Sequence, residues 1–182
     1  NSSITGAGEI RCTVGDGVVY DKAQGPTFTP GALSGFAGSL AIASTAKVGG
    51  NLQITFQSLP SEPEELKRDA ILVDGNATLR FECSGVIGPK CGITFTANSK
   101  PTIFVGDGCV IKIASAVIAQ SGFTKTGIGT VVMSGDVSQV AQNEIEVLQG
   151  DVVFGGVDVV SATLSGYVGE VDGLKHAPSV TI

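Results

Sequence analysis

The four cysteines, Cys12, Cys83, Cys91 and Cys109, are the side chains of this sequence with the most distinctive chemistry. Their number is even, and no CxxC pair of the kind common in zinc sites occurs. The segment CSGVIGPKC holds two glycines and a proline between Cys83 and Cys91, so it could close as a small disulfide loop. Cys12 and Cys109 would form the remaining bond. We expect two disulfides made in an oxidising compartment, with buried free thiols as the alternative.

Other side chains that could catalyse a reaction are scattered along the chain. A Ser-His-Asp triad would depend on His176 alone, which lies in a tail containing Gly and Pro. Glu82 with Glu144 or Glu146 could form the carboxylate pair of a tailspike-like glycan hydrolase. Such sites bind sugars on aromatic platforms, however, and this chain has no Trp and two Tyr. We therefore expect no enzymatic activity, no catalytic residue, no metal site and no cofactor, and we keep the hydrolase as an alternative.

The composition indicates a folded chain with an aliphatic core. Hydrophobic residues make up 42% and charged residues 15% of the 182 residues, which argues against disorder. The net charge is -6 and no cluster of Lys and Arg occurs, so we expect no nucleic-acid partner. No run of 18 apolar residues occurs, so we expect no membrane-spanning helix. The chain begins with Asn1, and we interpret it as a processed or excised chain.

Several short segments alternate between apolar and polar side chains, as strands with one dry and one wet face do. In NLQITFQ (51–57), the apolar residues Leu52, Ile54 and Phe56 alternate with polar ones. Comparable alternation covers the segments 77–83, 92–98, 109–115 and 143–149. Turns of Gly, Asn, Asp and Pro separate these segments. Because no helical segment of ten or more residues lies between strands, we predict an all-β chain rather than a parallel α/β sheet.

One charged segment, LPSEPEELKRDAIL (59–72), differs from the rest. Ser61 and Glu64 have the spacing of a capping box, and Pro63 would stand in the first turn of a helix, where proline is tolerated. We expect a short helical or loop excursion near 60–70, with its acidic side chains in solvent.

The chain is predicted to be a single β domain over residues 1–182. Residues 1–50 are rich in Gly, Pro and small side chains, and we interpret them as an irregular cap or a segment that pairs with a partner. We expect β coils over 51–170. Residues 171–182 form a C-terminal tail, and its SVTI end could add to the edge of a neighbour's sheet.

The spacing of the strands is compatible with two architectures. Without the 59–72 excursion, successive strands begin roughly 14 to 20 residues apart, and one coil of a β-helix needs on the order of 20 residues. An antiparallel β-sandwich or jelly roll, with turn signals every ~8–12 residues, is also compatible. Spacing alone leaves both open.

The order of elements over residues 123–156 favours the β-helix. FTKTGIGTVVMSGD (123–136) contains Thr-Lys-Thr-Gly, Gly-Thr, an apolar strand and a Ser-Gly turn. NEIEVLQGDVVFGG (143–156) adds two apolar strands around a Gly turn. This order resembles the passenger-associated repeat of bacterial autotransporters. The resemblance implies a right-handed parallel β-helix that is exported to the cell surface.

These observations together predict an exported structural or adhesive protein, extracellular or at the cell surface, that binds through extended β faces without catalysis. Because a β-helix exposes unpaired strand edges at both ends, we expect self-association into an oligomer or filament. A host or cell-surface glycan or protein is a further candidate partner. The alternative is a β-sandwich subunit of an extracellular filament or virion, assembled by strand donation.

Overall fold

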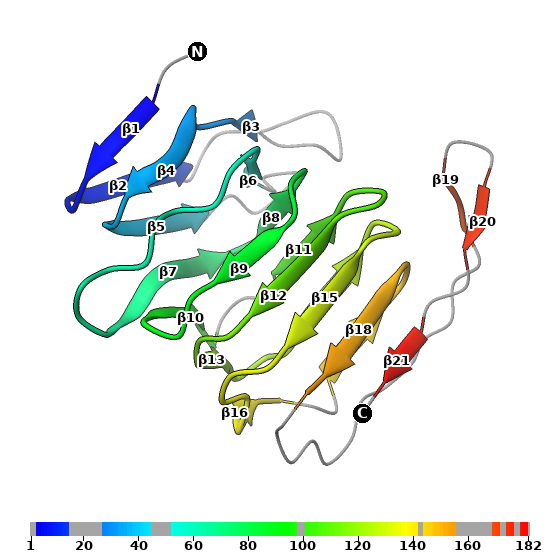
Figure 1. Ribbon diagram of the computed structural model, residues 1–182. Helices are drawn as coiled ribbons and strands as arrows, with labels where there is room; N and C mark the ends of the chain where they lie inside the picture. The colour runs from blue at the N-terminus through cyan, green and yellow to red at the C-terminus, as the bar shows by residue number, and fades with distance from the viewer. Residues whose placement is uncertain are drawn as a thin grey trace.

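The computed structural model describes residues 3–14, 27–44, 52–97, 101–141, 144–155, 169–171, 174–176 and 179–181. Its strands wind as a parallel β-helix of roughly five coils, which confirms the predicted fold class (Figure 1). Every pair of strands that these residues form is parallel, except the β19–β20 hairpin. The alternative of an antiparallel sandwich or jelly roll is therefore wrong. No helix within the described ranges is long and apolar enough to cross a membrane.

Three parallel sheets form the sides of the coils. Sheet 1 contains β2 (Glu9–Val14), β5 (Ser39–Ser44), β7 (Lys67–Gly75), β10 (Cys91–Phe95), β13 (Val117–Ala119) and β16 (Gln139–Val140). Sheet 2 contains β3 (Thr27–Phe28), β6 (Leu52–Phe56), β8 (Ala77–Phe81), β11 (Thr102–Val105), β14 (Phe123–Thr126) and β17 (Ile145–Val147). Sheet 3 contains β9 (Gly85–Ile87), β12 (Val110–Ile113), β15 (Thr130–Met133), β18 (Asp151–Phe154) and β21 (Ser179–Thr181).

Two smaller pairs complete the described strands. One is the parallel pair of β1 (Ser3–Gly6) and β4 (Ala32–Phe36), and the other is the hairpin of β19 (Gly169–Val171) and β20 (Leu174–His176). Strands of the segment 1–50 thus join the stack, because β5 pairs with both β2 and β7. In the tail 171–182, β21 adds to sheet 3 beside β18.

Each regular coil passes once through sheet 1, sheet 2 and sheet 3 before the chain returns to sheet 1. Residues that hydrogen-bond between neighbouring coils are therefore about one coil length apart in sequence. The separation is 21 residues for Thr130 and Asp151 and 24 residues for Ser121 and Ala97. These separations agree with the coil length expected for a β-helix.

The core is a narrow column of apolar side chains inside the coils. The predicted alternation is confirmed in β6, where Leu52, Ile54 and Phe56 are buried. Register places like side chains above one another, so Phe56 pairs with Phe81 of the next coil and their rings stack at 4.8 Å. Such stacked rings bury large apolar areas and gain a further favourable ring contact.

The segment between β6 and β7 is a loop, so the helical form of the predicted excursion is wrong. The Ser61 hydroxyl donates to the carbonyl of Ser34, and the Ser61 amide donates to the Phe36 carbonyl at 2.9 Å. On the other side, the Glu62 carboxylate accepts a hydrogen bond from the Lys90 amide at 2.9 Å. The Ser61 groups expected to cap a helix thus bond to β4, and the loop lies between β4 and the turn after β9.

We predict that Phe81→Ala lowers the free energy of unfolding by about 3–5 kcal/mol, since it leaves a cavity beneath the Phe56 ring. Chemical denaturation monitored by circular dichroism measures this change. Val86→Ala, at a side chain 55% exposed on the outside of β9, is the control and should cost about 1 kcal/mol or less. Equal losses in the two variants would contradict the account of the core.

Candidate functional site

The structure keeps apart the cysteine pairs proposed from the sequence. Cys83 precedes β9 and Cys91 opens β10, so the whole of β9 lies between them. Cys12 lies in β2 at the edge of sheet 1, several coils away from Cys109. All four thiols are free. Neither Cys83 with Cys91 nor Cys12 with Cys109 is brought together, because each pair would have to span one side of a coil or several coils.

The carboxylates considered for a hydrolase are also separated. Glu82 forms an ion pair with Arg80, and Glu146 accepts a hydrogen bond from the Thr124 hydroxyl at 3.3 Å. Glu82 follows β8, Glu144 directly precedes β17 and Glu146 lies in β17, and two further strands of sheet 2 stand between β8 and β17. Three strand spacings amount to about 14 Å. A glycosidase dyad needs about 5–9.5 Å, so these carboxylates do not form one.

Two other predicted features can be placed in the described part of the chain. His176 lies in β20, which pairs with β19. Across the described residues, no three His, Cys, Asp or Glu side chains stand close enough together to hold a metal ion.

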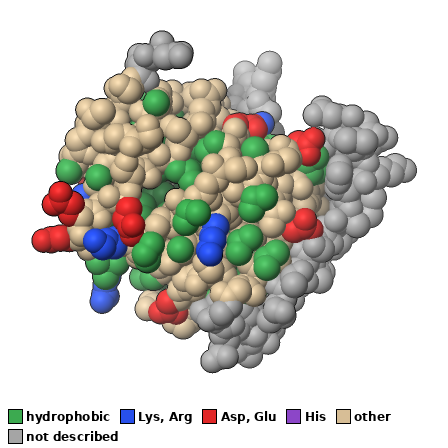
Figure 2. All heavy atoms as spheres, viewed as in Figure 1, with side chains coloured by type: hydrophobic (Ala, Val, Ile, Leu, Met, Phe, Trp, Pro, Cys, Tyr) green, Lys and Arg blue, Asp and Glu red, His purple; other side chains and the backbone are tan. Residues whose placement is uncertain are grey.

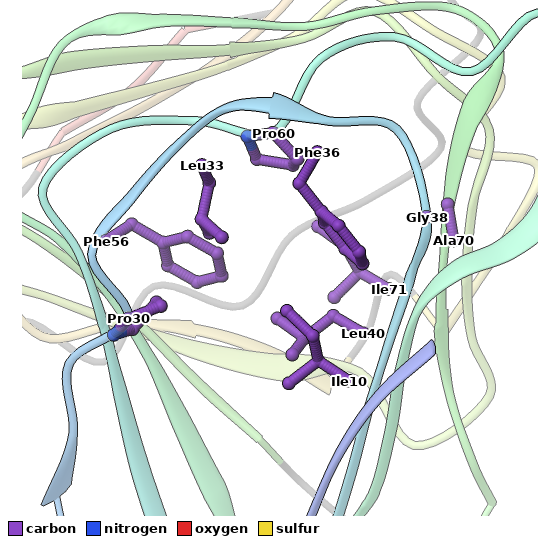
Figure 3. Close-up of a pocket in the computed structure, with 10 residues that line it drawn as sticks. All are labelled: Ile10, Pro30, Leu33, Phe36, Gly38, Leu40, Phe56, Pro60, Ala70 and Ile71. Carbon is purple, nitrogen blue, oxygen red and sulfur yellow. The ribbon is translucent and has the colours of Figure 1, made fainter. Parts of the chain in front are cut away.

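A cavity inside the N-terminal coils is too small to be a ligand site. Figure 3 shows Leu33, Phe36, Leu40, Phe56 and other apolar side chains pointing toward one another around it. The space left between them is about 10 Å³, near the lower limit for one water molecule. The cavity is therefore a packing gap in the column of apolar side chains.

A shallow groove of about 190 Å³ crosses the outer side of sheet 1. The groove is lined by the small residues Gly92 and Ala116 and by the exposed charged side chains of Arg68 and Asp136, together with other residues. Drug-sized ligands usually occupy ~300–1,000 Å³, so the groove is smaller than a typical pocket for such a ligand.

Among the described residues, two of the three large hydrophobic side chains that are exposed lie on the outer face of sheet 3. Val86 is 55% exposed and Val110 is 46% exposed. Register aligns Val86, Lys112, Val132 and Val153 in one row across β9, β12, β15 and β18. Figure 2 shows hydrophobic side chains gathered around a basic one over these strands. We call this surface the valine face.

The outer face of sheet 2 is polar by contrast. Thr78, Thr102 and Thr124 stand in register on successive coils. In the neighbouring row, the Arg80 guanidinium lies over the Phe104 ring at 3.9 Å, a cation–π contact. The two faces thus offer different chemistry on one rigid body.

Lys125 is the most unusual side chain of the structure, because it is fully buried within the coils. Its ammonium donates to the carbonyls of Thr126 at 2.8 Å, Gly127 at 2.7 Å and Gln149 at 3.2 Å. An ammonium has three donors, so its hydrogen-bonding capacity is filled. Lys125 therefore joins the corner after β14 to the corner of the next coil.

Glycines make these two corners possible. Gly127 and Gly150 have φ values of +73° and +70°, which other residues rarely adopt. A Cβ atom on Gly150 would stand 2.4 Å from the Gly127 carbonyl oxygen, so the stacked corners leave no room for a side chain there.

Burial of Lys125 was not foreseen from its residue type. The alternation in β14 does contain the signal, because Phe123 and Lys125 share one parity and Thr124 and Thr126 the other. Phe123 is an obvious core residue, so Lys125 must point inward with it.

Comparison of the chain with models of protein families, with curated proteins and with solved structures finds no match.

We predict that Lys125→Met lowers the free energy of unfolding by about 2–3 kcal/mol, because three corner carbonyls lose their buried donor. Urea denaturation at pH 7 measures the loss. Lys112→Met removes an exposed lysine from the valine face and should change stability by about 0.5 kcal/mol or less. A Lys125→Met protein as stable as wild type would show that the corner does not need the Lys125 amino group.

The stability of the protein should also rise with pH above neutrality. Burial lowers the pKa of Lys125 from 10.5 to about 7, and the Asp151 carboxylate opposes this shift. Between pH 7 and 10.5 the unfolded chain therefore holds a proton that the folded chain has lost, so raising the pH favours folding. We expect a gain of about 2 kcal/mol from pH 7 to 9.

Denaturation curves at several pH values check this gain, and Lys125→Met should abolish it. The measurement stops at pH 9, since burial raises the pKa of Cys91 from 9.0 to about 11, and this thiol opposes the rise in stability above that point. The same rise in wild type and Lys125→Met would contradict the assignment.

Proposed function

We propose that this protein is an exported structural or adhesive surface protein that acts through the outer faces of its coils and self-associates through the valine face. The observation that carries the proposal is the in-register row of Val86, Lys112, Val132 and Val153 on four consecutive strands. Exposed apolar side chains that gather on one surface and are bordered by polar ones often mark an interaction site.

The resemblance to the autotransporter repeat supports the exported location. Residues 123–154 run through β14, β15, β16, β17 and β18, which is more than one complete coil. The Thr-Lys-Thr-Gly element lies at the corner that Lys125 holds together, so this part of the motif has a structural role. A rigid stack of such coils supports extended contact surfaces, as solenoid proteins do.

A second copy of the chain is the partner that the charges on the valine face favour. Lys112 lies on β12 and Asp151 on β18, on either side of β15. A two-fold axis that runs parallel to β15 in the plane of the contact would place Lys112 of each copy opposite β18 of the other. Each Lys112 would then lie opposite Val153 of the other copy, with Asp151 two residues away along β18. A lysine side chain can reach that carboxylate, so two ion pairs would flank the contact between valines, and the interface would be isologous.

The area of four short strands is small for a protein interface, so the association should be weak. We expect a dissociation constant above about 10 μM, as for other contacts at the low end of interface size. Many copies held close together on a surface would still adhere strongly, since linked weak contacts reinforce one another.

We predict that the sedimentation coefficient rises with protein concentration, from about 10 μM to about 1 mM, as the monomer forms dimers. Val86→Glu with Val110→Glu should abolish this rise, because the new carboxylates cannot be desolvated cheaply in an apolar contact. Sedimentation velocity at several concentrations provides the measurement.

Leu66→Glu is the matched control, since Leu66 is 61% exposed but lines the groove on sheet 1 instead. It should leave the concentration dependence unchanged. A constant sedimentation coefficient for wild type, or an equal effect of both sets of variants, would rule out the valine face as the interface.

The export part of the proposal has a separate test. Protease added to intact cells that produce the protein should degrade it while a cytosolic marker survives. Protection of the protein until the cells are broken would contradict a surface location.

A further inference from the structure

The corner between sheets 2 and 3 places Cys83 and Cys109 on neighbouring coils. Before this corner, β8 and β11 are in register, with Phe81 beside Val105. After it, β9 and β12 are in register, with Gly85 beside Ile111. The corner segments between these positions must therefore lie over one another.

Between these paired positions, the corner from β11 to β12 (106–110) contains two more residues than the corner from β8 to β9 (82–84). A turn accommodates the two extra residues. The Cys109 amide donates to the Gly106 carbonyl at 3.2 Å, which closes a four-residue turn, and Gly108 within it has a φ of +66°. Beyond the turn Val110 lies next to Ser84, because the Val110 amide donates to the Ser84 hydroxyl at 3.0 Å, and the ladder resumes at the next residue with Ile111 beside Gly85. Counting back one more residue on each coil brings Cys109 beside Cys83.

This placement suits a covalent bond between the coils. Neighbouring strands lie about 4.8 Å apart, and disulfides form across Cα separations of about 4.4–6.8 Å. Both side chains are half-buried and pack against the core from the same corner. The two thiols also interact electrostatically. The pKa of Cys83 is raised most by burial, next by the charge of the Cys109 thiolate and least by Glu82.

We propose that Cys83 and Cys109 are a disulfide site that links two consecutive coils through a single bond at this corner. This site replaces the pairings of Cys83 with Cys91 and of Cys12 with Cys109. It does not depend on the valine face or on self-association.

The oxidant would be a small disulfide such as oxidised glutathione. The thiolate of one cysteine attacks its S–S bond and forms a mixed disulfide, releasing one glutathione thiolate. The thiolate of the other cysteine then attacks the protein sulfur of the mixed disulfide, which forms the Cys83–Cys109 bond and releases the second glutathione. Two thiols lose two electrons and two protons, and one glutathione disulfide is reduced to two thiols.

Cys91 does not compete for this bond in the folded protein. It is 4% exposed and lies beyond β9, with burial holding its pKa at about 11. Cys12 is in the edge strand β2, on a different side of the coils.

Peptide mapping of the folded full chain tests the proposal. The protein is incubated with oxidised glutathione near pH 8.5, where thiolates begin to form, and the remaining thiols are alkylated. Digestion after Lys and Arg, and before Asp, separates the fragment 81–90 with Cys83 from the fragment 107–112 with Cys109. Mass spectrometry should find these two fragments joined without reductant and separate with it.

Cys12→Ser combined with Cys91→Ala gives a protein whose remaining two thiols are the proposed pair. We expect both thiols to disappear on oxidation, and the midpoint of thermal unfolding to rise by about 5–10 °C relative to the reduced form. Cys109→Ser is the matched control and should show no such rise.

A link from Cys83 to Cys91, a link from Cys12 to Cys109, or four alkylated thiols after oxidation of the wild-type protein would overturn the proposal. The wild-type mapping decides the matter even if a variant fails to fold. Its result is independent of sedimentation, so failure of this site and failure of the valine face can be told apart.

Discussion

Backbone hydrogen bonding between parallel coils is the constraint on which the rest of the structure depends. Each coil takes its register from the one before it, so side chains at equivalent positions form ladders along the stack. Inside the coils the ladders are apolar and close the core. Outside, the same register turns isolated residues into continuous surfaces, which is how four short strands present one valine face. Solenoid folds typically bind partners through extended rows of surface side chains rather than through a single cleft.

The coils differ from one another mainly at their corners, and the cysteine pair and the buried lysine both lie at corners. Between sheets 2 and 3, one pair of coils brings together Cys83 and Cys109, and a later pair is joined by Lys125. In both cases the side chains act between coils rather than within one. Turn residues such as Gly108 and Gly127 adjust the corner length so that the strands on either side stay in register.

The strands could be predicted from sequence because alternation is a local property. Leu52, Ile54 and Phe56 reveal their face within one segment, and the resemblance over 123–156 supplied the parallel arrangement. The features that local patterns did not predict depend on contacts between coils. Ser61 carries a helix signal, but its groups bond to a neighbouring coil, and the cysteine pairing required the register between coils. Both depend on residues more than twenty positions away in sequence, which local patterns do not encode.

The most direct test of the coil stack is the pattern of backbone nuclear Overhauser effects in the folded protein. We predict contacts between amide and α protons that join Val110 to Thr130 and Thr130 to Asp151, continuing in the same direction along each strand. Close pairs of α protons running in opposite directions across sheet 3 would show antiparallel neighbours. That result would contradict the stacked coils and every surface derived from them.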